Sequence, residues 1–132
     1  MATLFTKIIN REIPAYIIAE DEHFIAILDI MPLVAGHTLV IPKKEIDYIF
    51  DLDNETLASM ILFAKKVAQT IKKVIPCKRI GIAVIGLEVP HTHVHLVPMN
   101  VMGDINFTKP KLNPSKEELE IVADKIRVAY SS

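Results

Sequence analysis

The chain has 132 residues, of which 51% are apolar, and its 15 Lys and Arg against 16 Asp and Glu give a formal net charge of −1. This length predicts a single domain over residues 1–132, and the charge balance excludes a strongly basic nucleic-acid-binding protein and an acidic tail protein. Because a small domain has little interior for its surface, the high apolar content favours a homodimer. The single cysteine, Cys77, excludes an intrachain disulfide.

No targeting or membrane segment is predicted. Residues 1–10 lack the basic start, long apolar stretch and small-residue cleavage site of a signal peptide. The longest uninterrupted apolar run, residues 80–87, is far shorter than the ~20 residues that span a bilayer. We therefore expect a cytoplasmic protein with no membrane partner and no nucleic-acid partner.

Three short strands are predicted in the first third of the chain. They are the partly β-branched runs at residues 16–20, 24–28 and 37–41. The polar residues 21–23 and the turn segment 32–36 separate them. An antiparallel meander is the simplest arrangement of three such strands.

The clearest helix is predicted over residues 53–75. Its apolar residues recur every three or four positions and so form one stripe: Leu57, Met60, Ile61, Ala64, Val67, Ala68, Ile71, Val74 and Ile75. Asp53 or Asn54 can cap its N-terminus, and Pro76 ends it.

Two further strands are predicted at residues 79–85 and 91–97, and a last helix begins near Ser115, which forms a capping box with Glu118. The sum is an α+β domain. It has about five antiparallel strands, one long helix and a C-terminal helix.

Three of the five histidines lie at alternate positions of the strand predicted at residues 91–97, as His91, His93 and His95. Side chains of a strand alternate between its faces, so the three imidazoles should form a row on one face. Crowded imidazoles disfavour one another's protonation, and a neutral imidazole can attack phosphorus or exchange protons with a substrate.

The spacing alone leaves two other interpretations open. A His-x-His pair often supplies metal ligands, although a row of three is too spread to meet one tetrahedral ion comfortably. A histidine-rich exposed strand without function is the other.

Residues 91–97, His-Thr-His-Val-His-Leu-Val, resemble the signature of the histidine-triad (HIT) family. Residues 5–14, 20–21, 28–32 and 36–43 are similar to further blocks of that family, in the same order. The resemblance covers roughly residues 4–98 and leaves residues 99–132 as a C-terminal extension with a helix. It implies a HIT-like fold in which the sheets of two protomers join in a homodimer.

The resemblance also implies roles for four histidines. His93 matches the nucleophile that forms a covalent nucleotidyl-histidine intermediate, and His95 would contact the phosphoryl oxygens and the leaving group. His91 and His37 would complete the hydrogen-bonded set that orients the nucleophile. Without the resemblance, His37 would be interpreted as a structural residue at the start of a strand.

Six other residues are nucleotide-binding candidates by resemblance. Asp29 matches the acidic residue that accepts hydrogen bonds from the ribose, although an Asp at this place also commonly caps a turn. Glu88 occupies a position where the family often has a Ser or Thr that donates to the phosphate. The apolar pocket for the base would comprise Leu4, Phe5, Ile8 and Ile30.

The implied function is that of a purine nucleotide-binding hydrolase or transferase acting at the α-phosphorus. The substrate would be a nucleoside phosphoramidate, an AMP ester or a dinucleoside polyphosphate. No cofactor is required and no resident metal is expected, because Thr3 and Thr6 replace the Cys-x-x-Cys zinc ligands of some relatives. Mg²⁺ is compatible with a polyphosphate substrate.

Departures from the family pattern keep two alternatives open. Residues 79–85 lack the Asn found in many members, and Glu88 would repel phosphate unless it is protonated or faces a cation. One alternative is a nucleotide-binding module with little or no catalysis. The other is a metal-dependent hydrolase that uses His93 and His95, with Glu88 or His37. Lys109 and Lys111 are expected in an exposed loop.

Overall fold

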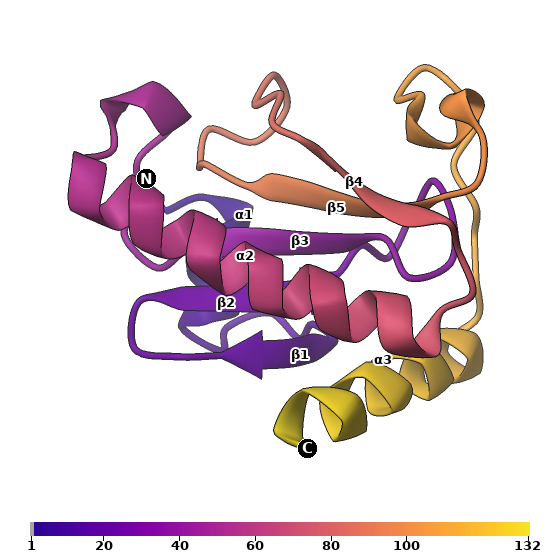
Figure 1. Ribbon diagram of the computed structural model, residues 1–132. Coiled ribbons are helices and arrows are strands. Elements are labelled where there is room, and N and C mark those ends of the chain that lie inside the picture. The colour runs from indigo at the N-terminus through magenta and orange to yellow at the C-terminus, as the bar shows by residue number, and fades with distance from the viewer. Residues whose placement is uncertain (1) are drawn as a thin grey trace.

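The computed structural model describes residues 2–132, and Met1, the remaining residue of the predicted domain, lies outside them. One five-stranded sheet has the order β1-β2-β3-β5-β4 (Figure 1), and each neighbouring pair is antiparallel. Its strands are β1 (Ile17–Glu20), β2 (Phe24–Leu28), β3 (Thr38–Pro42), β4 (Arg79–Ala83) and β5 (Val94–Met99). The helices are α1 (Leu4–Ile9), α2 (Asn54–Val74) and α3 (Lys116–Ser131), with 3₁₀ turns η1 (Ile49–Asp51) and η2 (Met102–Ile105).

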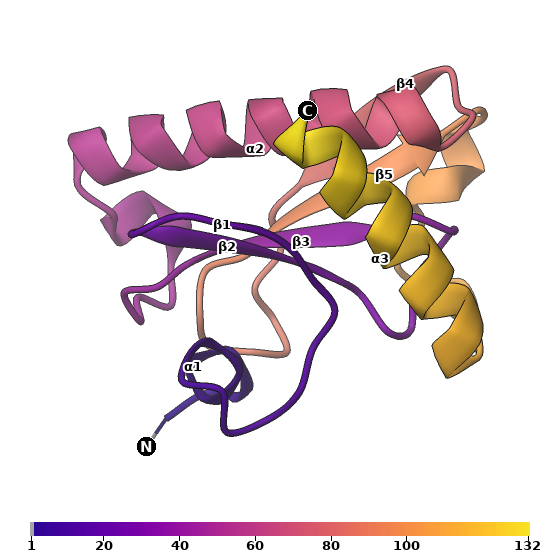
Figure 2. The ribbon, with the colours of Figure 1, turned by 90° about the horizontal axis from the view of Figure 1, so that it is seen from below.

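The helices cover both faces of the sheet. Figure 2 shows α2 on one face and α1 on the other, while α3 crosses in front of the sheet with its C-terminal end beside α2. Every residue of β2 and β3 is buried, because alternate side chains enter two separate cores. Phe24, Ala26 and Leu28 pack in the core that contains α2 and α3, whereas Ile25 and Ile27 pack in the core that contains α1.

The predicted α+β fold with a five-stranded antiparallel sheet is confirmed, as are the long helix and the capping box of the last one. The strand predicted to begin at His91 begins instead at Val94. The reason is that the N–H and the hydroxyl of Thr92 both donate to the carbonyl of Ile46, at 2.8 and 2.6 Å. The backbone N–H of Thr92 is therefore bonded to the segment that follows β3 and not to a strand of the sheet.

Helix α1 was not predicted, because six residues are too few to show a helical period. The hydroxyl of Thr3 caps it by accepting the N–H of Thr6 at 3.1 Å. Its buried side chains, Phe5 and Ile8, face the sheet. A helix this short has little stability of its own, so tertiary contacts must hold it in place.

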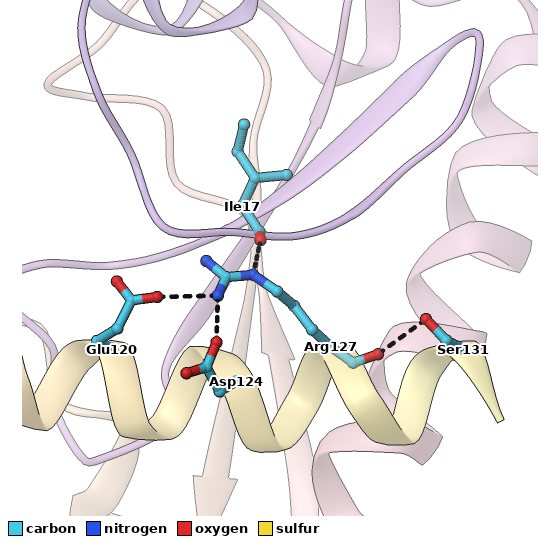
Figure 3. Close-up of polar contacts among 5 residues, drawn as sticks. All are labelled: Ile17, Glu120, Asp124, Arg127 and Ser131. Carbon is cyan, nitrogen blue, oxygen red and sulfur yellow. Dashed lines mark hydrogen bonds and ion pairs between the residues drawn. The ribbon is translucent and has the colours of Figure 1, made fainter.

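The free edge of β1 is bonded to α3 (Figure 3). Arg127 donates from Nε to the carbonyl of Ile17 at 2.7 Å, and Glu120 and Asp124 accept from its Nη1 at 3.0 and 2.6 Å. An unpaired carbonyl at a sheet edge is open to pairing with another strand, and this contact occupies it. Within residues 2–132, no helix combines the length and apolar character needed to cross a bilayer.

Candidate active site

A cavity of about 700 Å³ lies on the α1 face of the sheet. It is bounded by α1, the end of β2, the loop between β4 and β5, and the segment that follows η2. Eight of the ten predicted site residues line it: Leu4, Phe5, Ile8, Asp29, Ile30, Glu88, His93 and His95. The other two, His37 and His91, are buried behind it, with exposed fractions of 1% and 0%.

His93 presents one ring nitrogen to the cavity. Its Nδ1 lies 2.7 Å from the carbonyl oxygen of His91, and a carbonyl can only accept a hydrogen bond. Nδ1 therefore carries the hydrogen, and in the neutral ring Nε2 holds the lone pair. The Phe5 ring meets His93 edge-on, with centroids 4.9 Å apart, and restricts the orientation of the imidazole.

His95 presents an N–H to the cavity, where His93 presents a lone pair, because of a chain of hydrogen bonds behind His95. The backbone N–H of Leu33 donates to His37 Nδ1 at 3.1 Å, so His37 carries its hydrogen on Nε2. His37 Nε2 lies 3.0 Å from His95 Nδ1 and donates to it. His95 must then carry its own hydrogen on Nε2. A lone pair on His93 and an N–H on His95 thus lie side by side, with ring centroids 5.0 Å apart.

Burial disfavours the charged form of His37 and His95, the two rings of this hydrogen-bonded pair. It lowers the pKa of His37 to about 4 and that of His95 to about 3, from an ordinary value of 6.5, and nearby positive charge adds to both shifts. Burial likewise lowers the pKa of His91. The deduced positions of the hydrogens on His37 and His95 therefore hold at neutral pH.

Asp29 has one oxygen engaged and one that is not hydrogen-bonded to a residue of the described chain. Its Oδ1 accepts the N–H of Met31 at 2.9 Å, which is the turn-capping role, and its Oδ2 lies 3.8 Å from His37 Nε2. Burial raises the pKa of this carboxyl above its ordinary value. Because Asp29 lines the cavity, one oxygen can cap the turn while the other accepts hydrogen bonds from the hydroxyl groups of a ligand.

His91 lies apart from the cavity that His93 and His95 line, although the sequence predicts all three imidazoles in one row on the same face. His91 is fully buried, and its Nε2 donates to the carbonyl of Pro42 at 2.7 Å. Phe5 contacts the rings of both His91 and His93, so the two lie on the same side of the sheet. His91 does not line the cavity, and its carbonyl accepts the hydrogen bond from His93 Nδ1.

Two cavity residues come from the C-terminal segment that the sequence did not assign to the site. Phe107 packs edge-on against His95, with centroids 4.6 Å apart, and Lys111 lines the cavity where an exposed loop was expected. The N–H of Leu112 donates to the carbonyl of Pro32 at 2.9 Å and ties this segment to the β2–β3 loop. Lys111 also places a cation in the cavity that contains Glu88.

Within residues 2–132, the ligand atoms of Asp29, His37 and His95 lie within 4.8 Å of one another. Such a set could hold a divalent ion. However, His37 Nε2 and His95 Nδ1 already share a hydrogen, which an ion would have to displace. Coordination would also require both nitrogens about 2.0–2.1 Å from zinc.

Comparison with known proteins gives concordant results. The HIT domain model matches residues 10–102. A HIT-like protein of Borreliella burgdorferi is 34% identical over 125 residues, covering 89% of this chain and 90% of that protein. The adenosine 5′-monophosphoramidase HNT1 of Saccharomyces cerevisiae is 35% identical over 98 residues, covering 74% and 62%. The crystal structure of a Hit-like protein from Bartonella henselae superposes with a TM-score of 0.84 at 36% identity, covering 96% and 95%.

The buried histidine pair predicts a pH-dependent stability. Unfolded, both rings titrate near 6.5, whereas folded they stay neutral down to about 4 and 3. As the pH falls below 6.5, the unfolded chain binds protons that the folded chain does not, so the free energy of unfolding falls. Above that pH the pair contributes no pH dependence. We expect urea denaturation to show a loss of about 1–3 kcal/mol per pH unit between about pH 6 and 5.

His37→Gln removes one titrating ring and should reduce that slope by up to about 1.4 kcal/mol per pH unit. His23→Gln is the matched control, because the side chain of His23 is 72% exposed, and it should keep the wild-type slope. Equal slopes for wild type and His37→Gln would contradict the deduction.

Proposed function

The chain belongs to the HIT-domain family, and from that premise we propose that it is a purine nucleotide hydrolase that acts at the α-phosphorus through a covalent histidine intermediate. The observation that carries the proposal is the pairing of a lone pair on His93 with an N–H on His95 in one cavity. The relative named as an adenosine 5′-monophosphoramidase suggests the substrate class, a nucleoside 5′-phosphoramidate.

In the proposed reaction, His93 Nε2 attacks the α-phosphorus and forms an N–P bond while the bond from phosphorus to the leaving amine breaks. The amine leaves with a proton taken from water. The Nε2–H of His95 donates a hydrogen bond to a phosphoryl oxygen as negative charge develops there. Since the pKa of His95 is lowered to about 3, this ring acts as a hydrogen-bond donor and not as a cationic acid. A second water then attacks phosphorus, and the N–P bond breaks with its electron pair returning to His93 Nε2. The proton that this water loses neutralises the hydroxide left by the first step, and the nucleotide is released.

The rest of the cavity fits a purine nucleoside. Flat apolar surface suits a base, and it is provided by Leu4, Phe5, Ile8 and Ile30. The free oxygen of Asp29 suits the paired hydroxyls of a ribose. Lys111 suits the anionic phosphate and offsets the repulsion from Glu88.

We expect the purified protein to release AMP from adenosine 5′-monophosphoramidate. The release of AMP is measured by chromatography. His93→Ala should lower turnover by about a thousandfold or more, because the covalent step is lost, and should still bind AMP in calorimetry. His23→Ala, a substitution of an exposed histidine, should match wild type. Full activity of His93→Ala would contradict the proposal, and tight AMP binding by an inactive wild type would favour a binding module.

The metal-dependent alternative is favoured by one observation, the clustering of Asp29, His37 and His95. Treatment with a chelator separates the two functions in the same assay. The covalent mechanism keeps its activity after treatment, whereas a metal-dependent hydrolase loses it and regains it on addition of Zn²⁺.

A second prediction concerns Lys111. We expect Lys111→Met to raise KM for a dinucleoside polyphosphate about fivefold, because a cation beside a phosphate contributes about 1 kcal/mol. Its effect on adenosine 5′-monophosphoramidate should be smaller, since that substrate has a single phosphate. Lys109→Met, at an exposed position of the same segment, is the matched control. Equal effects of both substitutions would show that Lys111 does not contact phosphate.

We also propose that the protein is a homodimer joined through β4 and α2. Strand β4 is an edge strand, and exposed apolar side chains lie on these two elements, among them Ile82 and Leu62 at 55% and 66% exposure.

Light scattering should give twice the 14.8 kDa chain mass. Ile82→Glu should shift it towards the monomer because a buried charge opposes association, whereas Ile121→Glu, on the outer side of α3, should not. A monomeric wild type would contradict this proposal.

A further inference from the structure

His91 belongs to a group of hydrogen-bonded side chains that we call the Glu45 network: Thr3, Thr6, Glu45 and His91. One carboxylate oxygen, Glu45 Oε1, accepts the backbone N–H of Thr3 at 2.9 Å and the hydroxyl of Thr6 at 2.6 Å. The hydroxyl of Thr3 lies 2.9 Å from His91 Nδ1. The network therefore joins the start of α1 to the first histidine of the triad.

The position of each hydrogen in the network follows from its partners. His91 carries a hydrogen on Nε2, because the carbonyl of Pro42 can only accept. Its Nδ1 is then the acceptor in the neutral ring, and a hydroxyl must donate to it. The Thr6 hydroxyl already donates to Glu45, so Thr3 is the donor. The Thr6 hydroxyl, 3.5 Å from His91 Nδ1, is held by Glu45 at the shorter distance of 2.6 Å.

The same network supports two parts of the candidate active site. The carbonyl of His91 holds His93 Nδ1–H and so orients the ring with the free lone pair. Helix α1 carries Leu4, Phe5 and Ile8, which line the cavity, and the Phe5 ring contacts both His91 and His93. Because α1 has only six residues, its place depends on such anchors.

Glu45 itself is exposed, yet it is not a free surface carboxylate. The hydrogen bond from the Thr6 hydroxyl, followed by that from the Thr3 backbone, lowers the pKa of Glu45 to about 2. Hydrogen bonds to an ionised group are roughly twice as strong as neutral ones. Loop residue Glu45 is separated in sequence by 39 and 42 residues from the two threonines, so the contact orders distant parts of the chain.

We propose that Glu45 is a positioning residue, which holds α1 and the Thr3 hydroxyl through a single acceptor oxygen and thereby fixes His91 and the wall of the cavity. Glu45 does not touch the cavity and acts only through these neighbours. Its effect on the imidazoles does not depend on which reaction the protein catalyses. Its effect on turnover rests on the proposed function.

The first test uses NMR of the five imidazoles, whose nitrogen shifts report hydrogen and hydrogen-bond positions. In wild type at about pH 8, His91 Nδ1 should show the shift of a hydrogen-bonded acceptor. In Glu45→Ala it should move to the shift of an unbonded nitrogen, and the His93 ring protons should lose the ring-current shift from Phe5. Glu12→Ala, which removes an exposed carboxylate just beyond α1, should leave both unchanged.

Glu45→Gln tests the single-oxygen claim, because an amide keeps the acceptor oxygen but loses the charge. Its imidazole shifts should match wild type. Glu45→Gln spectra like those of Glu45→Ala, or wild-type His91 shifts in Glu45→Ala, would overturn the proposal. If Glu45→Ala fails to fold, Thr6→Val removes one of the two bonds and should move His91 Nδ1 in the same direction; an unmoved signal overturns the proposal.

The second test uses the phosphoramidate assay. Glu45→Ala should lower kcat/KM about tenfold, with a rise in KM as well as a fall in kcat, because both His93 and the wall made by α1 are displaced. Glu45→Gln should stay within about threefold of wild type. A fall in kcat alone would indicate only a smaller folded fraction and would contradict a positioning role. An inactive wild type would refute the proposed function and leave the NMR result to decide on Glu45.

Discussion

The site depends on one physical constraint, which is the placement of a single hydrogen on each buried imidazole. The N–H of Leu33 can only donate, and the carbonyls of His91 and Pro42 can only accept. These backbone groups have fixed roles, so they dictate where His37, His91 and His93 carry hydrogen, and His37 in turn dictates His95. The sheet and its loops therefore set the chemistry of the cavity before any ligand enters.

Burial stabilises the neutral form of these imidazoles and makes their protonation unfavourable. The rings of His37 and His95 are almost completely covered, and a positive charge there would lose its hydration. Among residues 2–132, every buried side-chain nitrogen and oxygen has a hydrogen-bond partner, so the polar interior is fully satisfied in the neutral state. The same coverage of His37 and His95 makes the free energy of unfolding fall as the pH falls below their ordinary pKa.

Much of the fold could be predicted from the sequence, because the spacing of apolar residues in a long segment indicates whether it forms a helix or a strand. The period of α2 and the capping box of α3 are local signals. The early start of β5 was wrong because Thr92 bonds to Ile46, a distant residue that no local pattern reveals. Helix α1 was missed because its position is set by tertiary contacts.

The residues of the site also divide into those that local motifs identify and those that depend on tertiary contacts. Asp29 and the four histidines lie in motifs that resemble the family, and all of them fall within the matched range of residues 10–102. Phe107 and Lys111 lie beyond that range, and they line the cavity in a segment that is bonded to the β2–β3 loop through Leu112 and Pro32. Only the assembled fold could show them. The wall of the cavity thus combines residues of the family motifs with residues from a stretch of chain outside them.

The route of the C-terminal segment has a further consequence. Phe107 covers His95 on one face of the sheet, and a few residues later α3 fills the core on the opposite face with Leu119, Ala123 and Ile126. The chain therefore passes from one face of the sheet to the other between Phe107 and Leu119. One connecting segment thus joins a wall of the cavity to the core on the opposite face of the sheet, so the placement of Phe107 and of the last helix depends on the same stretch of chain.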